Sequence, residues 1–330
     1  MSATLSIVIP VYNEEEGLAH LYERLYPELD KLGRRYEAIF VDDGSTDRSV
    51  ALLREQFQRR PDTTRVIVLA RNAGQHMAIL AGFAQTRGDY VVTLDADLQN
   101  PPEEIVKIVA AMDAGADYVG TVRARRHDVY WRKAASRLMN RIRERTTQIS
   151  ISDQGCMLRG YHRNIVQAIN RCLEVSTYVP ALGYTFARHP VEIEVAHAKR
   201  KEGQSKYSLY RLIRLNFDLM TGFSVAPLQF FTMAGTALAV LSLLGVFGLA
   251  LRRLIVGPEA EGVFTLFGIA FFLIGVLLIG LGVVGEYVGR IYEQVRQRPR
   301  YTIAAVLEEA DDTQRKQALQ RIEHSVEGME

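Results

Sequence analysis

The pattern of apolar and polar positions divides the chain into two parts, and the first part alternates short apolar runs with amphipathic stretches. Helical periodicity covers 15–32 and 103–114, and the second stretch follows Asn100-Pro101-Pro102, a sequence that favours a helix start. Alternation on this scale predicts an α/β domain with a mostly parallel, doubly wound sheet, which binds ligands beyond the carboxyl ends of its strands. The runs expected to form strands are 5–11, 38–41, 66–70, 90–94 and 118–122.

Two uncharged runs, 230–251 and 263–284, mark the second part of the chain. Roughly 20 apolar residues cross the hydrocarbon core of a bilayer, so each run is predicted to be a transmembrane helix. The connection 252–262 is too short for a domain. The runs are therefore expected to form a hairpin, 230–287, with both flanks on one side of the membrane. The alternative is a pair of helices buried in a soluble core.

Basic residues predict which side of the membrane the flanks occupy, because cytoplasmic flanks carry an excess of lysine and arginine. Arg252 and Arg253 lie in the connection and are outnumbered by the basic residues outside the hairpin. The large polar part and the tail 288–330 are therefore expected in the cytoplasm. The flanking basic residues are Lys199, Arg200, Lys201, Lys206, Arg211, Arg214, Arg290, Arg296, Arg298 and Arg300.

Two further segments are predicted to lie in the membrane interface. Residues 131–147 carry six basic side chains among Leu138, Met139 and Ile142, and residues 208–229 have a similar mixed pattern. An ordinary solvated helix face is the alternative for the first segment. The resulting division is a globular domain over 1–207 that includes the first segment, a juxtamembrane helix over 208–229, the hairpin and the tail.

Composition and charge narrow the class of protein further. The 330 residues are 48% hydrophobic, enough for a substantial core, and a net charge of +2 gives no reason to expect nucleic-acid binding. Cys156 and Cys172 form no CxxC pair and are expected to be buried thiols in a reducing compartment. The first apolar run begins almost at the N-terminus without a basic leader, so no cleavable signal peptide is expected.

The strongest candidate for chemistry is the end of the fourth apolar run, which is followed by Asp95 and Asp97. Carboxylates spaced in this way at a strand end can hold a hard divalent cation against phosphate oxygens, and Gln99 offers a further oxygen ligand. An isolated Asp-x-Asp is common in solvated turns. Its position after a buried strand of an α/β domain is what favours a metal site here.

Polar side chains also follow the other predicted strands. Asp42 and Asp43 come after the second run, where they could accept hydrogen bonds from a base or a ribose. Tyr12 and Glu14 place an aromatic ring and a carboxylate after the first run. His76 follows the third run, and we expect it to be a helix N-terminal residue without a part in the chemistry.

Small residues in the second apolar run produce two motifs. Residues 280–285 read GxGxxG, the fingerprint of dinucleotide-binding folds, but they lie within an apolar run and follow no strand. Close packing of helices explains this string better. Gly285 and Gly289 form a GxxxG pair in the same region and favour self-association into a homo-oligomer.

Together, the loops after the first four runs resemble those of the inverting glycosyltransferases with the GT-A fold, glycosyltransferase family 2, over about residues 5–220. With the two apolar runs, the chain resembles the polyprenyl-phosphate glycosyltransferases, a group that includes the dolichol-phosphate mannose synthases. The wording of the loops closely resembles that of the bacterial enzymes that use 4-deoxy-4-formamido-L-arabinose as the sugar. This resemblance rests on NAGQH at 72–76, LDADLQNPPEEI at 94–105, GTVR at 120–123, DQGCMLR at 153–159 and GEYVGRIY at 285–292.

The resemblance implies a UDP-sugar donor, undecaprenyl phosphate as the acceptor, contact with the lipid bilayer and a location in the bacterial inner membrane. It also implies Mg²⁺ or Mn²⁺ as the cofactor, bound with the donor diphosphate by Asp95, Asp97 and Gln99. The residues that it assigns to the uridine are Pro10, Tyr12, Glu14 and Asp42.

The resemblance further implies a carboxylate at Asp153 and a basic segment that includes Arg200 and Lys206. Arg123 and Lys206 are candidates for gripping phosphates, because fixed cations bind donor diphosphate and acceptor phosphate. Contact with lipid headgroups is the alternative for both. Asp97, Asp153, Arg123 and Lys206 are therefore the residues expected to act in transfer, with Arg200 at the donor phosphates.

The expected acceptor determines how much acid–base chemistry the reaction needs. A phosphate monoester has a second pKa of about 6, so it is largely a dianion at neutral pH and needs no strong general base. Asp153 is therefore expected to orient groups more than to remove a proton. A single in-line displacement would invert the configuration of the anomeric carbon.

Two other classes of function are alternatives to this transfer. A processive polysaccharide synthase would carry Gln-x-x-Arg-Trp, and the only tryptophan, Trp131, lies in a different context. A non-catalytic membrane partner that senses nucleotide is a second alternative, although the intact Asp95 and Asp97 argue against it. Glucose and N-acetylated sugars are alternatives for the transferred sugar, because no residue by itself identifies the sugar pocket.

Overall fold

The computed structural model describes residues 4–123, 151–153, 155–172, 178–197, 225–257, 263–296 and 298–309. The chain divides into two compact units. The α/β unit comprises 1–127, 151–203 and 298–330, and the helical unit comprises 128–150 and 204–297. The predicted interfacial segment 131–147 and most of the predicted juxtamembrane helix 208–229 lie outside the described residues.

Eight strands form one sheet in the α/β unit: β1 (Leu5–Val11), β2 (Tyr36–Asp42), β3 (Thr64–Leu69), β4 (Tyr90–Thr93), β5 (Tyr118–Arg123), β6 (Arg159–His162), β7 (Pro190–Val195) and β8 (Ile303–Leu307). Their order is β7-β5-β6-β4-β1-β2-β3-β8. β1 pairs in parallel with β2 on one side and with β4 on the other, and β2 pairs in parallel with β3. The predicted parallel arrangement is therefore confirmed for the centre of the sheet.

Three strands lie outside the five predicted runs. β6 is antiparallel to both β4 and β5, β7 is parallel to β5, and β8 is antiparallel to β3. β6 has only four residues, and β7 is largely exposed, so neither has the apolar signal of a buried strand. β8 follows the two long helices in the sequence, and no local pattern connects it with the sheet.

Helices cover both faces of the sheet, as predicted for a doubly wound domain. Ile7 and Ile9 of β1 share a core with Leu18. Val8, between them, contacts the helix that carries Gly82, where an added Cβ would clash with Val8 Cγ1. Successive side chains of a strand point to opposite faces, so the helices that carry Leu18 and Gly82 lie on opposite sides. The helices of this unit are α1 (Leu18–Lys31), α2 (Ser49–Arg59), α3 (Gln75–Phe83), α4 (Ile105–Asp113), α6 (Arg163–Arg171) and α7 (Val179–Phe186).

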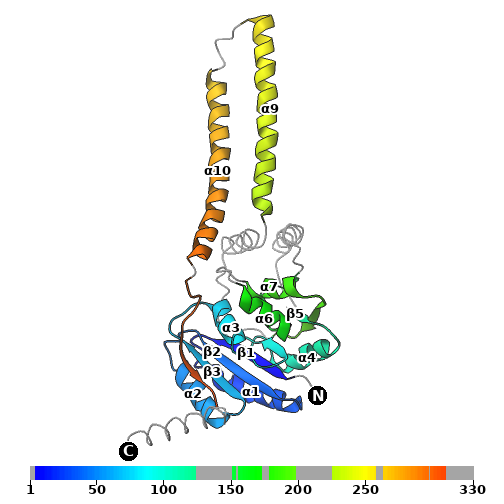
Figure 1. The fold of residues 1–330 in the computed structure, drawn as a ribbon, viewed down its shortest axis with the longest axis vertical. Coiled ribbons are helices and arrows are strands. Elements are labelled where there is room, and N and C mark those ends of the chain that lie inside the picture. Colours follow the sequence, from blue (N-terminus) through cyan, green and yellow to red (C-terminus); the bar gives the residue numbers. More distant parts are fainter. Residues whose placement is uncertain are drawn as a thin grey trace, which may run out of the picture. The chain divides into compact units, whose positions relative to one another are not determined.

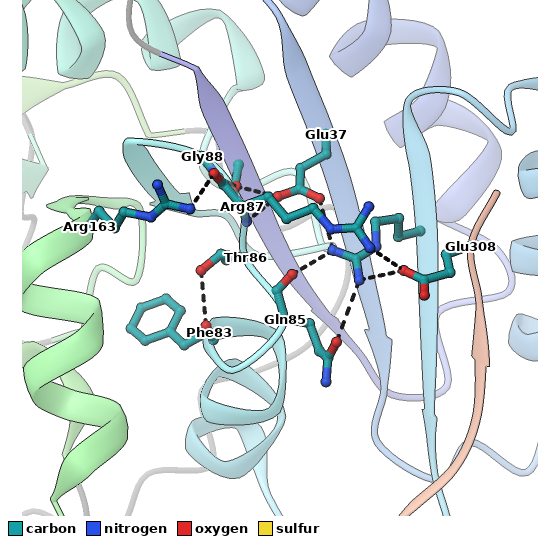
Figure 2. A network of polar contacts seen from close by, with 10 residues as sticks. Glu37, Phe83, Gln85, Thr86, Arg87, Gly88, Arg163 and Glu308 are labelled. Atoms are coloured by element: carbon teal, nitrogen blue, oxygen red, sulfur yellow. Dashed lines mark hydrogen bonds and ion pairs between the residues drawn. The ribbon is translucent and has the colours of Figure 1, made fainter. Parts of the chain in front are cut away.

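The strand β8 pairs with β3 at the edge of the sheet (Figure 1). Ion pairs formed by Glu308 also hold it there. Glu308 accepts hydrogen bonds from Arg65 at 2.8 Å and from Arg87 at 2.7 Å, and Figure 2 shows the Arg87 contact. Arg65 also donates to Glu37 at 2.9 Å, and only 7% of its side chain is exposed. Carboxylate partners offset the cost of removing the Arg65 guanidinium group from water. The segment predicted as a separate tail therefore supplies an edge strand of the sheet.

The helical unit contains two long helices, α9 (Ala226–Val256) and α10 (Val263–Val295). The predicted spans 230–251 and 263–284 lie within them, but α10 continues beyond the predicted end of its span. Among the described residues, one stretch, Ile269–Val295, is long and apolar enough to cross a membrane, while Leu228–Leu238 in α9 is a shorter apolar segment. One candidate span is therefore present, and the hairpin of two spans stays a prediction.

Replacing Glu308 should loosen β8 without unfolding the domain. In Glu308→Gln, Arg65 keeps Glu37 but loses a charged partner, so we expect a loss of about 1 kcal/mol of stability and faster amide hydrogen exchange in 303–307. Thermal unfolding and hydrogen exchange of the detergent-solubilised protein measure both effects. The exposed neighbour offers a matched control in Glu309→Gln. Unchanged exchange in β8 would contradict a role for the network in holding this strand.

Candidate active site

Most of the predicted site residues lie in loops at one edge of the sheet. The strands β1 to β4 are parallel, and β5 has the same direction as β4 because both are antiparallel to β6. The carboxyl ends of these five strands therefore meet at the same edge, where β6 begins. Asp42 ends β2, Arg123 ends β5, and Asp95 follows closely after β4.

Asp95 lies in a polar but largely water-shielded position after β4. Its carboxylate accepts hydrogen bonds from Gln75 Nε2 at 2.6 Å and from Asn100 Nδ2 at 3.2 Å. Burial raises the pKa of Asp95 to about 7, and the negative charge of Asp97 contributes to this increase. Near neutral pH this carboxyl group is therefore partly protonated, and a bound cation would displace that proton.

Asp97 and Gln99 form a compact turn next to Asp95. Asp97 accepts the main-chain N–H of Gln99 at 3.1 Å and its side-chain amide at 2.5 Å. Between them, Leu98 has a φ of 57°, in the left-handed region that an L-residue adopts only in tight turns. The three residues predicted to bind metal therefore belong to a single turn.

The donors of this turn fit a divalent cation that obtains its other ligands from phosphate oxygens and water. Within the described residues, no group of three or more carboxylates, histidines or cysteines could hold a metal ion on its own. Asp95, Asp97 and the Oε1 of Gln99 could supply some of the oxygen ligands of a divalent cation, which suits a cation bound together with a nucleotide diphosphate. Gln99 donates through its Nε2 here, so its amide would have to rotate to present Oε1.

Asp42 at the end of β2 has one carboxylate oxygen available for a ligand. Its Oδ2 accepts the N–H groups of Gly44 and Ser45, both at 3.1 Å, while its Oδ1 is buried and has no hydrogen-bond partner. Buried polar atoms are nearly always satisfied in proteins, so an N–H or O–H of a bound nucleoside is a suitable partner for this oxygen.

Asp43 joins two loops of the site instead of facing a ligand. Its carboxylate accepts the N–H groups of Ala73 and Gly74, at 2.7 and 2.9 Å, and burial raises its pKa despite these contacts. At Gly44, φ is +70° and a Cβ would lie 2.6 Å from Asn72 N, so a glycine is required for the loops to pack this closely. The sequence pattern did not separate this structural role from that of Asp42.

The loop after β1 lies against the turn after β4. Pro10 belongs to β1, and Tyr12 follows it with 47% of its surface exposed. A Cβ on Gly17 would lie 3.5 Å from Glu14 Oε2 and 3.8 Å from the Ala96 carbonyl oxygen. Glu14, one of the predicted uridine residues, therefore lies near the predicted metal turn. The exposed ring of Tyr12 has a surface on which a base could stack.

Arg123 and Asp153 form a two-pronged ion pair. Arg123 donates from Nε to Asp153 Oδ2 at 2.6 Å and from Nη2 to Oδ1 at 2.8 Å. Asp153 is 1% exposed and also accepts the N–H of Gly155 at 3.1 Å. The positive charge of Arg123 acts on Asp95 and lowers its pKa, against the stronger effect of burial. The pair therefore lies near the metal turn, with its cation fixed by a buried carboxylate.

Three side chains of the site were missed by the sequence interpretation. Gln75 and Asn100 support Asp95, and His197 contacts Asn100 Oδ1 through Nδ1 at 3.4 Å. Burial and the charge of Arg123 lower the pKa of His197, which also lies within the influence of Asp153 and Asp97. The sequence signal that could have identified His197 is its position two residues after β7. The carboxyl end of β7 lies at the same edge of the sheet as that of β5.

Other predicted residues have different outcomes. Arg200 and Lys206 lie outside the described residues. Cys156 is buried as expected, whereas Cys172 is only half-buried. His76, the second residue of α3, packs edge-on against Tyr178, and burial lowers its pKa to about 4. It is therefore neutral at physiological pH, and its predicted lack of a role in the chemistry stays a prediction.

The α/β unit, with its carboxylate turn after β4, has the architecture of a GT-A glycosyltransferase. A model of glycosyl transferase family 2 matches residues 6–169. The chain is 49% identical over 305 residues to the undecaprenyl-phosphate 4-deoxy-4-formamido-L-arabinose transferase of Edwardsiella ictaluri (strain 93-146), with 92% of this chain and 94% of that protein covered. The transferase of the same name from Proteus mirabilis (strain HI4320) is 50% identical over the same shares.

The chain therefore belongs to glycosyltransferase family 2, and within it to the family of these undecaprenyl-phosphate transferases, so the predicted family is confirmed. Solved structures are more distant. Glucosyl-3-phosphoglycerate synthase from Mycobacterium tuberculosis, in complex with Mn²⁺, UDP-glucose and phosphoglyceric acid, is 18% identical, with a TM-score of 0.47 over 67% of this chain and 78% of that one.

The raised pKa of Asp95 leads to a prediction about stability. The folded state holds this proton more tightly than the unfolded state, where the pKa is near 3.8, so wild-type stability falls as the pH rises towards 7. Asp95→Asn removes this effect. We expect its Tm, without metal, to exceed the wild-type Tm by a few degrees at pH 8 and by less at pH 5.

Thermal unfolding at the two pH values measures this difference. Asp62→Asn, which changes an exposed aspartate, is the control and should show no pH-dependent gain. An equal gain for Asp95→Asn at both pH values would contradict the raised pKa.

Proposed function

We propose that the protein transfers 4-deoxy-4-formamido-L-arabinose from its UDP donor to undecaprenyl phosphate and releases UDP. The observation that carries this proposal is the identity of about half of all residues with transferases of that name over 92% of the chain, which includes both the α/β unit and the long helices. The turn formed by Asp95, Asp97 and Gln99 supports an active enzyme, because a protein that only senses nucleotide would not need intact donors for a metal.

The acceptor supplies its own nucleophile in this reaction. Undecaprenyl phosphate is largely a dianion at neutral pH, so the enzyme has to bring two anionic groups together more than it has to remove a proton. Asp153 is suited to orient Arg123 more than to remove a proton, because both of its carboxylate oxygens already accept hydrogen bonds from Arg123. Attack in line with the departing diphosphate inverts the anomeric carbon.

A divalent cation, Mg²⁺ or Mn²⁺, would neutralise charge on the departing diphosphate. Asp95, Asp97 and Gln99 are the residues proposed to hold it. Arg123 is proposed to grip phosphate oxygens while Asp153 fixes its guanidinium group, since a positioned cation stabilises developing negative charge without having to reorganise. Lys206 is proposed to act in the same way.

The donor nucleoside is proposed to occupy the loops after β1 and β2. The unpartnered Oδ1 of Asp42 is suited to accept a hydrogen bond, and Tyr12 offers an exposed ring. Pro10 and Glu14 belong to the same loop region, and Arg200 is proposed to bind the donor phosphates.

The helical unit is proposed to anchor the enzyme in the bacterial inner membrane with α9 and α10 as a hairpin of two spans and both termini in the cytoplasm. The apolar stretch Ile269–Val295 supports one span directly. The segments 131–147 and 208–229 are proposed to lie in the interface, and Gly285 and Gly289 to support a homo-oligomer.

The lipid-linked product would serve lipid A modification, which lowers the negative charge of lipid A and hence the binding of polymyxin.

The two predicted roles of the aspartates can be separated by substitution. We expect Asp97→Ala to reduce transfer by at least about 1000-fold, because it removes a metal ligand, and Asp153→Asn to retain a measurable fraction of activity. The rate of UDP release with saturating lipid measures both, and matching Tm values show that each variant is folded. Equal and complete loss in the two variants would instead favour an essential general base at Asp153.

The donor is tested with a panel of UDP-sugars. Purified enzyme and undecaprenyl phosphate are incubated with UDP-4-deoxy-4-formamido-L-arabinose, UDP-glucose or UDP-N-acetylglucosamine, and the lipid product is identified by mass spectrometry. We expect the formamido sugar to be transferred with the highest kcat/KM and no product to form with Asp97→Ala. Exclusive use of UDP-glucose would overturn the proposed donor. Tight UDP binding without any lipid product would favour the nucleotide-sensing alternative.

A further inference from the structure

A fully buried arginine lies behind the candidate site. Arg159, the first residue of β6, is 0% exposed, and none of the described carboxylates pairs with its guanidinium group. Its hydrogen-bond acceptors are instead the Asp153 carbonyl at 2.6 Å, the Cys156 carbonyl at 2.9 Å and the Tyr118 hydroxyl at 2.7 Å. A buried cation without a counter-ion is unfavourable for folding, and a leucine would pack such a strand more simply. A role in the reaction would account for its presence.

The geometry of these contacts resembles a clamp. One planar guanidinium group holds the main chain at both Asp153 and Cys156, with Nη2 on the first and Nε on the second. A rigid fork of donors fixes two acceptors relative to each other, which a flexible lysine ammonium group cannot do. The segment that carries the carboxylate of Asp153 is therefore fixed from the core side.

Two lines of contact lead from this clamp into the site. The first runs from Asp153 to Arg123 through the two-pronged ion pair. The second leads from Cys156 to Asp95 through Asn100. The Cys156 thiol donates to Asn100 Oδ1 at 3.3 Å, and Asn100 Nδ2 donates to Asp95 Oδ2 at 3.2 Å. The same buried group therefore supports the cation that would grip phosphate and a carboxylate that would hold the metal.

We propose that Arg159 is a positioning residue that sets the separation between Arg123 and Asp95, and with it the approach of the acceptor phosphate to the donor. This inference rests on the proposed transfer between two phosphorylated substrates, for any sugar donor. Both substrates are anionic, so the rate depends strongly on how the groups that hold them are spaced. A misplacement of about 1 Å is enough to reduce a rate about 100-fold.

The test compares Arg159→Lys and Arg159→Met with Tyr118→Phe, which removes only the third partner of the guanidinium group and leaves both carbonyl contacts. We expect kcat to fall about 100-fold in the two Arg159 variants, with KM for the UDP-sugar within about threefold of wild type, and to change little in Tyr118→Phe. The kcat values are normalised to the UDP-binding sites counted by calorimetry, so loss of folded protein does not imitate the effect.

A double variant tests whether Arg159 acts through Arg123. Arg123→Lys combined with Arg159→Lys should reduce kcat by less than the product of the two single losses, because the part of the Arg159 effect that runs through Arg123 is already lost. Wild-type kcat in a folded Arg159 variant, or losses that multiply in the double variant, would overturn the inference.

Gly155→Ala gives a second route if the Arg159 variants do not fold. An added Cβ would lie 2.7 Å from Arg123 Nη2 and should push the guanidinium group of Arg123 out of its ion pair with Asp153, while Arg159 keeps its contacts. We expect the same loss of kcat, and an unchanged kcat would show that the clamped geometry does not control the rate. If the wild-type enzyme transfers no sugar from any donor, the proposed function itself fails, an outcome distinct from active Arg159 variants.

Discussion

Two carboxylates held close together and away from water repel each other, and the site depends on how this repulsion is balanced. Burial and the charge of Asp97 raise the pKa of Asp95 to about 7, while amide donors from Gln75 and Asn100 act in the opposite direction. Gln75 begins α3 and Asn100 precedes α4. The loops after β3 and β4 must therefore pack against each other before these carboxylates can bind the proposed cation. Asp43 serves this packing from a third loop.

The parts of the fold that were predictable are those in which local pattern and position in the sheet agree. The first five strands are buried runs, so their apolar composition identifies them, and each is followed by a polar residue that parallel pairing brings to the same edge. Asp95, Asp97 and Asp42 were predicted as site residues in this way. The pattern gave no way to tell Asp42, which keeps an unpartnered oxygen, from Asp43, whose oxygens are both taken by main-chain N–H groups.

What the sequence did not reveal depends on partners far apart in the chain. Arg159 looks like an exposed residue of a short polar strand, and only the tertiary structure brings its guanidinium group against the Tyr118 hydroxyl, 41 positions away in the sequence. His197 reaches Asn100 across 97 positions of sequence, and Glu308 reaches Arg65 across 243. Hydrophobic periodicity has no information about such pairs, because it describes burial within one element.

The pairing of β8 with β3 has a consequence for how the protein is made. Because β8 is synthesised after both long helices, β3 emerges from the ribosome with an unpaired edge and keeps it while α9 and α10 are completed. Unpaired edges of folding intermediates are sites of wrong association between chains. Arg65 and Arg87 lie at or near that edge during this interval, and their charges disfavour pairing with a second copy until Glu308 arrives. Pairing of β8 with β3 therefore ends the exposure of the β3 edge.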